Sequence, residues 1–240
     1  MIAIFDLDGT LVKSGGQITD DVIDILQKMV HKRIDLAIAT GGQYHRVKWQ
    51  LRTRTDLFKY IFCECGAVTY IDGILVREVD VFDEVDQDLL KAVFRVFIDQ
   101  CDKYDIESMG NRIDVRLGLI YLTPVGIEAT EDLREPFIKF EQESQLRVEM
   151  IEHLKGVDAS NKLSFVKGGK TGISVYPKGV DKTQIMDQLP ADEELYFFGD
   201  NCGPDGNDRP LYKHPKTKGY EVRDYKHCRE LLKTLFDFNL

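Results

Sequence analysis

Short apolar runs followed by polar or glycine residues recur near both ends of the chain. They are found at residues 1–5, 34–40, 59–76, 194–200 and 219–222. Runs of this length that are bounded by turn residues are typical of buried β-strands. Within the third run, Asp72-Gly73 separates two apolar stretches and is a hairpin signal. The pattern therefore predicts a set of buried strands, one of them continued by a hairpin.

Helical periodicity appears between the first two strands and after the last one. In "ITDDVIDILQKMV", Thr19 is a candidate N-cap and acidic residues occupy the first turn. The apolar residues that share one face of this helix are Val22, Ile25, Leu26 and Met29. Alternating strands and helices favour a parallel sheet with helices on both faces. The predicted fold class is therefore α/β, with a doubly wound parallel sheet.

The middle of the chain has a different order of elements. The pattern predicts a helix at 87–101, a strand pair within 111–126, a helix at 146–156 and a strand pair within 162–177. This order is typical of an antiparallel α+β module with its own sheet. Because parallel-sheet signals lie on either side, we interpret the module as an insertion. The predicted organisation is a core of residues 1–81 and 178–240 and an inserted cap of residues 82–177.

The composition is that of an ordinary globular protein, with 43% apolar and 30% charged residues among 240. No segment has the apolar length of a membrane span, and the first strand leaves no room for a secretion signal. The net charge of -9 and the absence of a basic stripe argue against a nucleic-acid partner. Five scattered cysteines indicate free thiols in a reducing compartment. We therefore expect a cytoplasmic protein with no membrane or nucleic-acid partner.

Polar side chains follow several of the predicted core strands at the point where each ends. These positions are Asp6-Leu7-Asp8, Thr40-Gly41-Gly42 and Asp200. The carboxyl ends of strands in an open α/β sheet border the ligand crevice, so these side chains are expected to converge. Asp6 and Asp8 alternate along the chain, so both carboxylates should face the crevice. Gly9 lets the backbone bend there, and Thr10 can hydrogen-bond the bend locally.

Two carboxylates this close repel each other unless a cation or a shared proton relieves the pair. Mg²⁺ takes oxygen ligands and retains some waters, and Asp200 with Asp208 would complete a magnesium site with Asp6 and Asp8. One acid can then attack phosphorus to form an aspartyl-phosphate while its neighbour carries the proton. The metal and a lysine would offset the charge of the transferring phosphoryl group. The cluster thus predicts magnesium-dependent phosphoryl transfer.

Motifs that suggest a calcium loop, a P-loop or a zinc site fit those functions poorly. An EF-hand register from Asp6 would need glycine where Leu11 stands. "GGKT" at 168–171 resembles the end of a P-loop, but the spacing needs glycine where Ser164 stands, and a lysine-bearing β-turn is the simpler interpretation. Cys63-x-Cys65 is spaced too closely for zinc and is better explained by buried strand thiols. "GDNCGPDGND" alone is as consistent with a solvated turn as with a metal site.

Four stretches resemble the motifs of the haloacid dehalogenase (HAD) superfamily of phosphotransferases. In chain order they are "FDLDGTL", "ATGG", "GVDKTQ" and "FFGDNCGPDGND". Four more stretches resemble the eukaryotic-type phosphomannomutase family of that superfamily, again in the same order: "YIFCECGAVTYIDG", "TPVG", "GGKTGISVYPKGVDK" and "HPKTKGYEV". The resemblance implies a Rossmann-like HAD core with an inserted α+β cap. It also implies Mg²⁺, a sugar phosphate substrate, mannose metabolism, and a hexose bisphosphate activator if the enzyme is a mutase.

The resemblance also implies roles for the core residues. Asp6 would be the nucleophile, Asp8 the general acid/base and Lys182 the lysine of the third motif, while Asp200 and Asp208 would complete the metal end. Thr40 corresponds to the phosphoryl-binding threonine of the superfamily. The neighbouring substrate-binding positions would be Gly42 and Gln43, although phosphomannomutases usually carry a hydroxyl where Gln43 stands.

In the cap, the resemblance implies arginines that hold the non-reacting phosphate as the cap closes over the sugar. Arg116 and Arg134 match two of them, and Lys170 and Ser174 fall on the neighbouring substrate-binding segment. The departures from the family pattern fall on substrate recognition: Ile127 and Gly15 replace arginines, Gly172 and Ser174 replace a serine and an aspartate, and Cys65 replaces an asparagine. Lys167 or Lys170 could substitute for the missing arginine as a point charge. A homodimer through the cap is a further expectation.

Three functions remain compatible with the sequence. The first is a phosphomannomutase that converts mannose 6-phosphate to mannose 1-phosphate, and the second is a magnesium-dependent sugar-phosphate phosphatase that has lost retention of the bisphosphate. The third is a non-catalytic binding module on the same fold. Such a module would have little need of Asp6, Asp8, Lys182, Asp200 and Asp208 together. The mutase is favoured because the likeness covers both core and cap.

Overall fold

The computed structural model describes residues 1–83 and 85–236. It divides the chain into two compact units, Met1–Val79 with Asp181–Leu240, and Asp80–Val180. The sequence placed the corresponding junctions at 81 and 178, within a few residues of these positions. We refer to the first unit as the core and to the second as the cap. Among the described residues, no helix has the length and apolarity needed to cross a bilayer.

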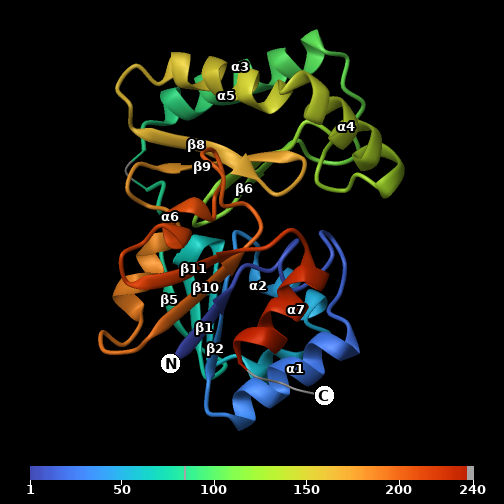
Figure 1. The fold of residues 1–240 in the computed structure, drawn as a ribbon. Coiled ribbons are helices and arrows are strands. Elements are labelled where there is room, and N and C mark those ends of the chain that lie inside the picture. The colour runs from blue at the N-terminus through green and yellow to red at the C-terminus, as the bar shows by residue number, and fades with distance from the viewer. Residues whose placement is uncertain (84, 237–240) are drawn as a thin grey trace. The chain divides into compact units, whose positions relative to one another are not determined.

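The core contains a seven-stranded sheet (Figure 1). The strand order is β11-β10-β1-β2-β3-β4-β5, with β1 Ile2–Phe5, β2 Asp35–Ala39, β3 Tyr60–Cys63, β4 Val68–Ile71, β5 Ile74–Glu78, β10 Leu195–Gly199 and β11 Thr217–Glu221. Strands β11 to β3 are parallel, whereas β3-β4 and β4-β5 pair antiparallel. The α/β prediction is confirmed, and the Asp72-Gly73 turn joins β4 to β5 as the sequence indicated.

Apolar side chains cover both faces of this sheet, which explains the uninterrupted apolar runs of its central strands. One face, which includes Ile4 and Phe197, packs against the 3-10 helix η3 (Lys182–Gln188) and the short helix α6 (Arg209–Tyr212). The helices near the other face are α1 (Asp20–His31) and α7 (Tyr225–Leu235), which contact each other. The remaining core helices are α2 (Tyr44–Gln50), η1 (Arg54–Leu57) and η2 (Glu64–Gly66).

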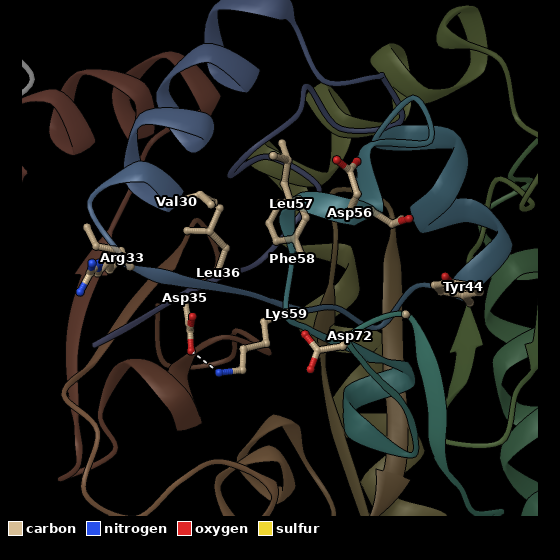
Figure 2. Close-up of a pocket in the computed structure, with 13 residues that line it drawn as sticks. Val30, Arg33, Asp35, Leu36, Tyr44, Asp56, Leu57, Phe58, Lys59 and Asp72 are labelled. Atoms are coloured by element: carbon tan, nitrogen blue, oxygen red, sulfur yellow. Dashed lines mark hydrogen bonds and ion pairs between the residues drawn. The ribbon is translucent and has the colours of Figure 1, made fainter.

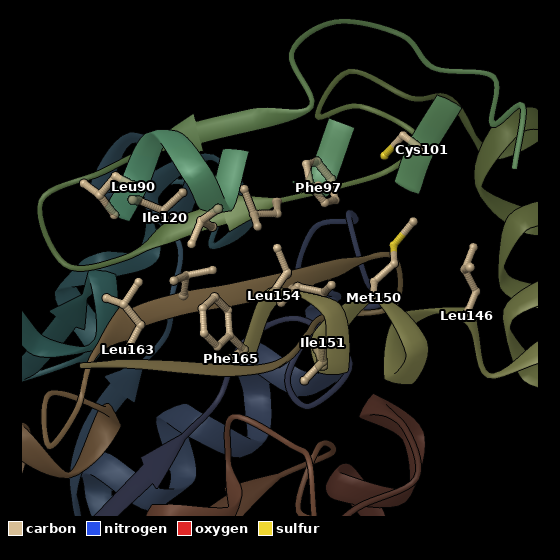
Figure 3. Packing of buried hydrophobic residues seen from close by; sticks show 14 of the residues in the cluster. Leu90, Phe97, Cys101, Ile120, Leu146, Met150, Ile151, Leu154, Leu163 and Phe165 are labelled. Carbon is tan, nitrogen blue, oxygen red and sulfur yellow. The ribbon is translucent and has the colours of Figure 1, made fainter. Parts of the chain in front are cut away.

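The cap contains a four-stranded antiparallel sheet of order β6-β7-β9-β8. Its elements are α3 Gln87–Lys103, β6 Ile113–Val115, β7 Ile120–Leu122, α4 Glu131–Ser144, α5 Leu146–Val157, β8 Leu163–Gly168 and β9 Gly172–Pro177. Figure 3 shows Phe97 of α3 and Leu154 of α5 packing toward Ile120 and Phe165 of the sheet. The two helices therefore cover one face of the sheet.

The other face of the cap sheet carries a row of mainly polar residues. Asp114, Tyr121, Ser174 and Val166 are cross-strand neighbours on β6, β7, β9 and β8 in turn. Because successive residues in a strand point to opposite faces, this row lies opposite the apolar side chains of the cap core. We call it the polar face of the cap sheet.

Helix α4 was not predicted from the sequence. Its segment carries Pro136 within the helix and shows a broken apolar periodicity, with Phe137 buried but Phe140 exposed. Proline lacks a backbone donor and ordinarily signals a helix end, which explains why the pattern did not reveal this element. Tertiary packing of Phe137 against the cap core compensates locally.

Candidate active site

Three carboxylates from two distant parts of the chain meet at the carboxyl end of the core sheet. Asp6 directly follows β1, Asp200 directly follows the neighbouring β10, and Asp208 lies just before α6. One carboxylate oxygen from each lies within 4.8 Å of the others. The two strands are locked in register, since the Asp6 N–H donates to the Phe198 carbonyl at 2.9 Å. Parallel pairing therefore produces the convergence that the sequence predicted for Asp6 and Asp200.

A buried lysine bridges two of these acids. Lys182 Nζ donates to Asp6 Oδ1 and to Asp208 Oδ1, each at 2.6 Å. Its side chain is 1% exposed, and that of Asp208 is also 1% exposed. Lys182 is the first residue of η3, and the Asp181 carboxylate caps this helix by accepting from the Thr183 N–H. In the third motif, "GVDKTQ", Asp181 thus caps the helix whose first residue is Lys182, and this fixes the position of the lysine.

Negative charge exceeds positive charge in this cluster. Burial raises the pKa of Asp6 well above its ordinary value, the Asp208 and Asp200 carboxylates raise it further, and Lys182 only partly lowers it. Burial lowers the pKa of Lys182, but the attraction of Asp208 and Asp6 outweighs it and the pKa is raised. Three carboxylates with one ammonium group leave an excess of negative charge, which a divalent cation would offset. The donor set, all hard oxygens, fits Mg²⁺.

Gly9 allows Asp200 to approach the first motif. Its φ of +93° is favoured only for glycine, and a Cβ at this position would lie 2.7 Å from Asp200 Cγ. Any other residue here would displace that carboxylate. The neighbouring Thr10 departs from expectation: its buried hydroxyl makes no hydrogen bond to another described residue, so the predicted local bond is wrong. The bend is instead held by backbone bonds such as Gly9 N–H to Val12 O at 2.8 Å.

The Asp8 side chain lies outside the three-carboxylate cluster. Its Oδ1 accepts from the Gly15 N–H at 2.7 Å and from Gln50 Nε2 at 2.9 Å. Its Oδ2 lies 3.8 Å from Arg46 Nη2. The sequence predicted Asp8 both as the acid/base and as a metal ligand. This geometry supports the first role, because the carboxylate is oriented independently of the cluster.

Arg46 and Gln50 were missed by the sequence analysis. Both lie on α2, four residues apart, so they project from one face of that helix toward Asp8. The four-residue spacing of Arg46 and Gln50 can be seen in the sequence soon after "ATGG". It was not recognised because α2 is short and was not predicted. Gln50 is a buried polar residue, 1% exposed, whose amide has a specific partner.

Replacement of Gln50 by alanine is expected to lower kcat by about 10- to 100-fold with little change in KM. The substitution removes a hydrogen bond to a carboxylate, which is worth about 1.5–3 kcal/mol. Steady-state kinetics with the sugar phosphate substrate would measure this effect. Gln17→Ala is the matched control, because Gln17 donates to the Trp49 carbonyl on the surface. Wild-type kcat in Gln50→Ala would show that Asp8 does not depend on this bond.

The predicted phosphoryl-binding loop follows β2. Thr40 is buried, and its Oγ1 accepts from the Gly42 N–H at 3.0 Å. The Thr40 backbone is fixed on both sides, with its N–H bonded to Phe62 O and its carbonyl to the Cys65 N–H. Gln43 is the N-cap position of α2, but its side chain does not cap the helix. The threonine hydroxyl is therefore held against the loop backbone, while the roles of Thr40, Gly42 and Gln43 stay predictions.

A separate pocket of about 680 Å³ lies at the opposite edge of the core sheet. Figure 2 shows Asp35, Lys59 and Asp72 around it, and Asp35 and Lys59 stand at the amino ends of β2 and β3. Lys59 Nζ pairs with Asp35 Oδ2 at 2.6 Å. None of the residues that line this pocket belongs to the carboxylate cluster. Its location argues that it is not the reaction site.

In the cap, Arg116 and Ser174 are associated with the polar face. Ser174 is buried on β9, and Arg116, just after β6, pairs with Asp114 Oδ2 through Nε at 2.7 Å and Nη2 at 2.6 Å. Lys170 is exposed in the turn between β8 and β9, and Arg134 lies in the first turn of α4. The sequence-predicted cap residues thus come from separate elements of the cap, and their contact with substrate stays a prediction.

Lys167 does not substitute for the arginine missing at Ile127. It is the cross-strand neighbour of Ile173, whose side chain is in the cap core, so it points away from the polar face. Its Nζ pairs with the buried Glu141 Oε1 at 3.1 Å, and Glu141 also pairs with Arg147 Nε at 3.1 Å. Lys170 is therefore the remaining candidate to substitute for the arginine that is missing at Ile127.

Comparison with known proteins identifies the family. The model of the family "Eukaryotic phosphomannomutase" matches residues 22–238. A curated phosphomannomutase from Babesia bovis is 32% identical over 236 residues, covering 97% of this chain and 96% of the relative. Phosphomannomutase from Arabidopsis thaliana is 29% identical over 238 residues, covering 98% and 96%. Human phosphomannomutase 1 is 28% identical over 241 residues, covering 96% and 92%.

Solved structures support the same fold. A sugar phosphatase of HAD subclass IIB is similar with a TM-score of 0.59 at 18% identity, covering 99% of this chain and 98% of that one. The C-terminal domain of a C. albicans trehalose-6-phosphate phosphatase gives a TM-score of 0.62 at 16% identity, covering 98% and 91%. Together with the acid and lysine cluster, these matches confirm the resemblance seen in the sequence: the chain belongs to the eukaryotic phosphomannomutase family of HAD phosphotransferases.

Proposed function

We propose that the chain is a phosphomannomutase, which interconverts mannose 6-phosphate and mannose 1-phosphate through an aspartyl-phosphate on Asp6. The observation that carries this proposal is the buried cluster of Asp6, Asp208 and Lys182 with Asp200 at its edge. Relatives that match nearly the whole chain are named phosphomannomutase, which supports the choice of substrate. In this proposal the core performs phosphoryl transfer and the cap recognises the sugar phosphate.

Asp6 and Asp8 divide the chemistry between them. A carboxylate oxygen of Asp6 attacks phosphorus, the bond from phosphorus to the sugar oxygen breaks, and Asp8 donates a proton to that oxygen. In the reverse direction Asp8 accepts the proton of the attacking sugar hydroxyl while the phosphoryl group leaves Asp6. The bonds from Gly15 and Gln50 to Asp8 would hold its carboxylate in one orientation for both steps. Lys182 offsets charge that develops on the phosphoryl group.

Mg²⁺ is the cofactor in this proposal, held by Asp6, Asp200 and Asp208 with Asp8 as the further predicted ligand. When bound there, it would offset negative charge on the transferring phosphoryl group. The residues fit this role, because the cluster is oxygen-only, carries excess negative charge and raises the pKa of Asp6. Hexose bisphosphate is proposed as the activator that first phosphorylates the enzyme.

Removal of divalent cations is expected to abolish turnover. The chain treated with excess chelator should lose all measurable activity, because the carboxylate cluster would then repel the incoming phosphate. Addition of Mg²⁺ beyond the chelator should restore the original rate, and K⁺ at equal ionic strength serves as the control. Full activity in the presence of chelator would contradict the assignment of the cluster as a magnesium site.

A single assay separates mutase from phosphatase. The protein is incubated with mannose 1-phosphate, Mg²⁺ and a hexose bisphosphate, and both mannose 6-phosphate and free phosphate are followed over time. We expect the isomer to form with little free phosphate. Free phosphate without isomer would contradict the mutase and identify a hydrolase, because it would show that water, rather than a sugar hydroxyl, takes the phosphoryl group from the aspartyl-phosphate on Asp6.

The cytoplasmic location and the homodimer through the cap stay predictions. All five cysteines are free and buried, in keeping with a chain that needs no disulfides. Light scattering of the purified protein would measure its oligomeric state directly.

A further inference from the structure

Tyr121 occupies the centre of the polar face of the cap sheet. It lies on β7 between Asp114 of β6 and Ser174 of β9. The guanidinium carbon of Arg116 stands 5.3 Å from the centre of the Tyr121 ring. Arg116 is therefore held in two ways, by the Asp114 carboxylate through two N–H donors and by the ring.

The same ring fills a slot made by two glycines. A Cβ on Gly172 would overlap Tyr121 Cζ, and a Cβ on Gly168 would lie 3.1 Å from Tyr121 Cε2. The Tyr121 hydroxyl donates to the Gly168 carbonyl at 3.1 Å. Gly172 stands where the family pattern has a substrate-contacting serine. In this chain the aromatic ring thus occupies the space that a side chain at 172 would need.

Tyr121 also fixes the turn that carries Lys170. Its hydroxyl bonds the turn at Gly168, and Arg147 Nη1 holds it at the Gly169 and Gly172 carbonyls, at 3.0 and 3.1 Å. The turn is thereby tied to both β7 and α5. One tyrosine contacts both the predicted phosphate-binding arginine and the segment that bears the remaining lysine candidate.

We propose that Tyr121 is a positioning residue for substrate recognition: it orients Arg116 and the Gly168–Gly172 turn as one anion-binding surface for the non-reacting phosphate of the hexose phosphate. Where the family has a serine, this chain has Gly172, and the Tyr121 ring fills the space that a side chain there would need. The residues at 121 and 172 therefore depend on each other. The inference rests on the proposed function, since it assigns a role in binding that substrate. It adds a determinant of affinity and leaves the chemistry at Asp6 unchanged.

The test is a double-mutant cycle on KM for mannose 1-phosphate in the full-length protein with Mg²⁺ and a hexose bisphosphate. Tyr121→Ala should raise KM about tenfold with kcat nearly unchanged, because it removes one stacked cation and one hydrogen bond. Tyr121→Phe, which keeps the ring, should raise KM by about threefold or less. Arg116→Ala should raise KM by about one to two orders of magnitude. Tyr121→Ala added to Arg116→Ala should raise it no further.

Two controls distinguish positioning from general damage. Tyr104→Ala removes a tyrosine that has Lys103 over its ring at 4.7 Å and a hydroxyl bond to Glu149 at 2.7 Å, and it should leave KM unchanged. Gly172→Ser should mimic Tyr121→Ala, because the new side chain displaces the ring. Thermal unfolding verifies that each variant is folded.

The outcomes separate this inference from the proposed function. Unchanged KM in folded Tyr121→Ala, or additive effects of the Tyr121 and Arg116 substitutions, would overturn the inference while an active wild type upholds the mutase. A wild-type protein without mannose phosphate turnover would overturn the proposed function, and the inference with it. A tenfold rise in KM that disappears in the Arg116→Ala background would support the inference.

Discussion

Asp6→Asn is expected to lower turnover by at least about four orders of magnitude, because it removes the oxygen nucleophile that becomes phosphorylated. The fold should persist, since asparagine has the same shape and its Oδ1 can still accept from Lys182, which retains Asp208 as a partner. A coupled assay for mannose 6-phosphate formation measures the loss. Labelling with a radioactive hexose bisphosphate should give a phosphorylated wild-type protein and an unlabelled variant.

Asp35→Asn is the matched control for this substitution. Asp35 stands at the amino end of β2, paired with Lys59 at the edge of the sheet remote from the cluster. Its side chain is 38% exposed, so the loss of this ion pair should cost little stability and no activity. Turnover of Asp6→Asn at the rate of Asp35→Asn would refute the nucleophile assignment.

Lys182→Met is expected to give the largest loss of stability among these variants. Removal of one partner from a buried ion pair costs about 3–5 kcal/mol, because the remaining charge has no compensation. Here Asp6 and Asp208 would both lose the ammonium group that they share. Activity should fall together with stability. Urea unfolding monitored by far-ultraviolet circular dichroism measures the change in free energy.

Mg²⁺ distinguishes this electrostatic effect from a simple packing defect. Without Lys182, Asp6 and Asp208 lose the ammonium group that they share, so Mg²⁺ should stabilise Lys182→Met more than it stabilises the wild type. Lys218→Met, which removes an exposed partner of Glu194, should change neither stability nor its dependence on Mg²⁺ appreciably. If Lys182→Met unfolded at the wild-type urea concentration, the cluster would not be electrostatically strained.

The convergence of Asp6 with Asp200 could be predicted from sequence because it depends only on strand order. Both residues follow apolar runs, and the carboxyl ends of neighbouring parallel strands meet at one edge. The strands of the cap were predictable for a similar reason, since their alternation survives in "KLSFVKGGKTGISVYP". Local periodicity thus predicted the strands and the edge of the sheet at which polar groups gather, but not helices α2 and α4.

The details that periodicity alone does not predict depend on contacts between segments. Alternation predicted that the carboxylates of Asp6 and Asp8 would both face the crevice, but it did not reveal that Asp8 bonds Gly15 and Gln50, and the role of Asp8 as a metal ligand stays a prediction. The bond to Gln50 requires α2, a helix too short for its periodicity to stand out. The sequence alone could not show which face of the cap sheet Lys167 points to. That direction depends on the strand register, which pairs Lys167 with Ile173. A one-residue shift would have placed it on the polar face.

The position of β1 also has a consequence for biosynthesis. β1 is synthesised well before β10, yet β10, which begins at Leu195, is one of its two neighbours in the sheet. The cap segment 80–180 has its own apolar interior and can condense while the rest is still being translated. Strand β1 can therefore pair only with β2 until β10 has been synthesised. Nascent chains stalled before residue 195 should accordingly be the ones most dependent on chaperones.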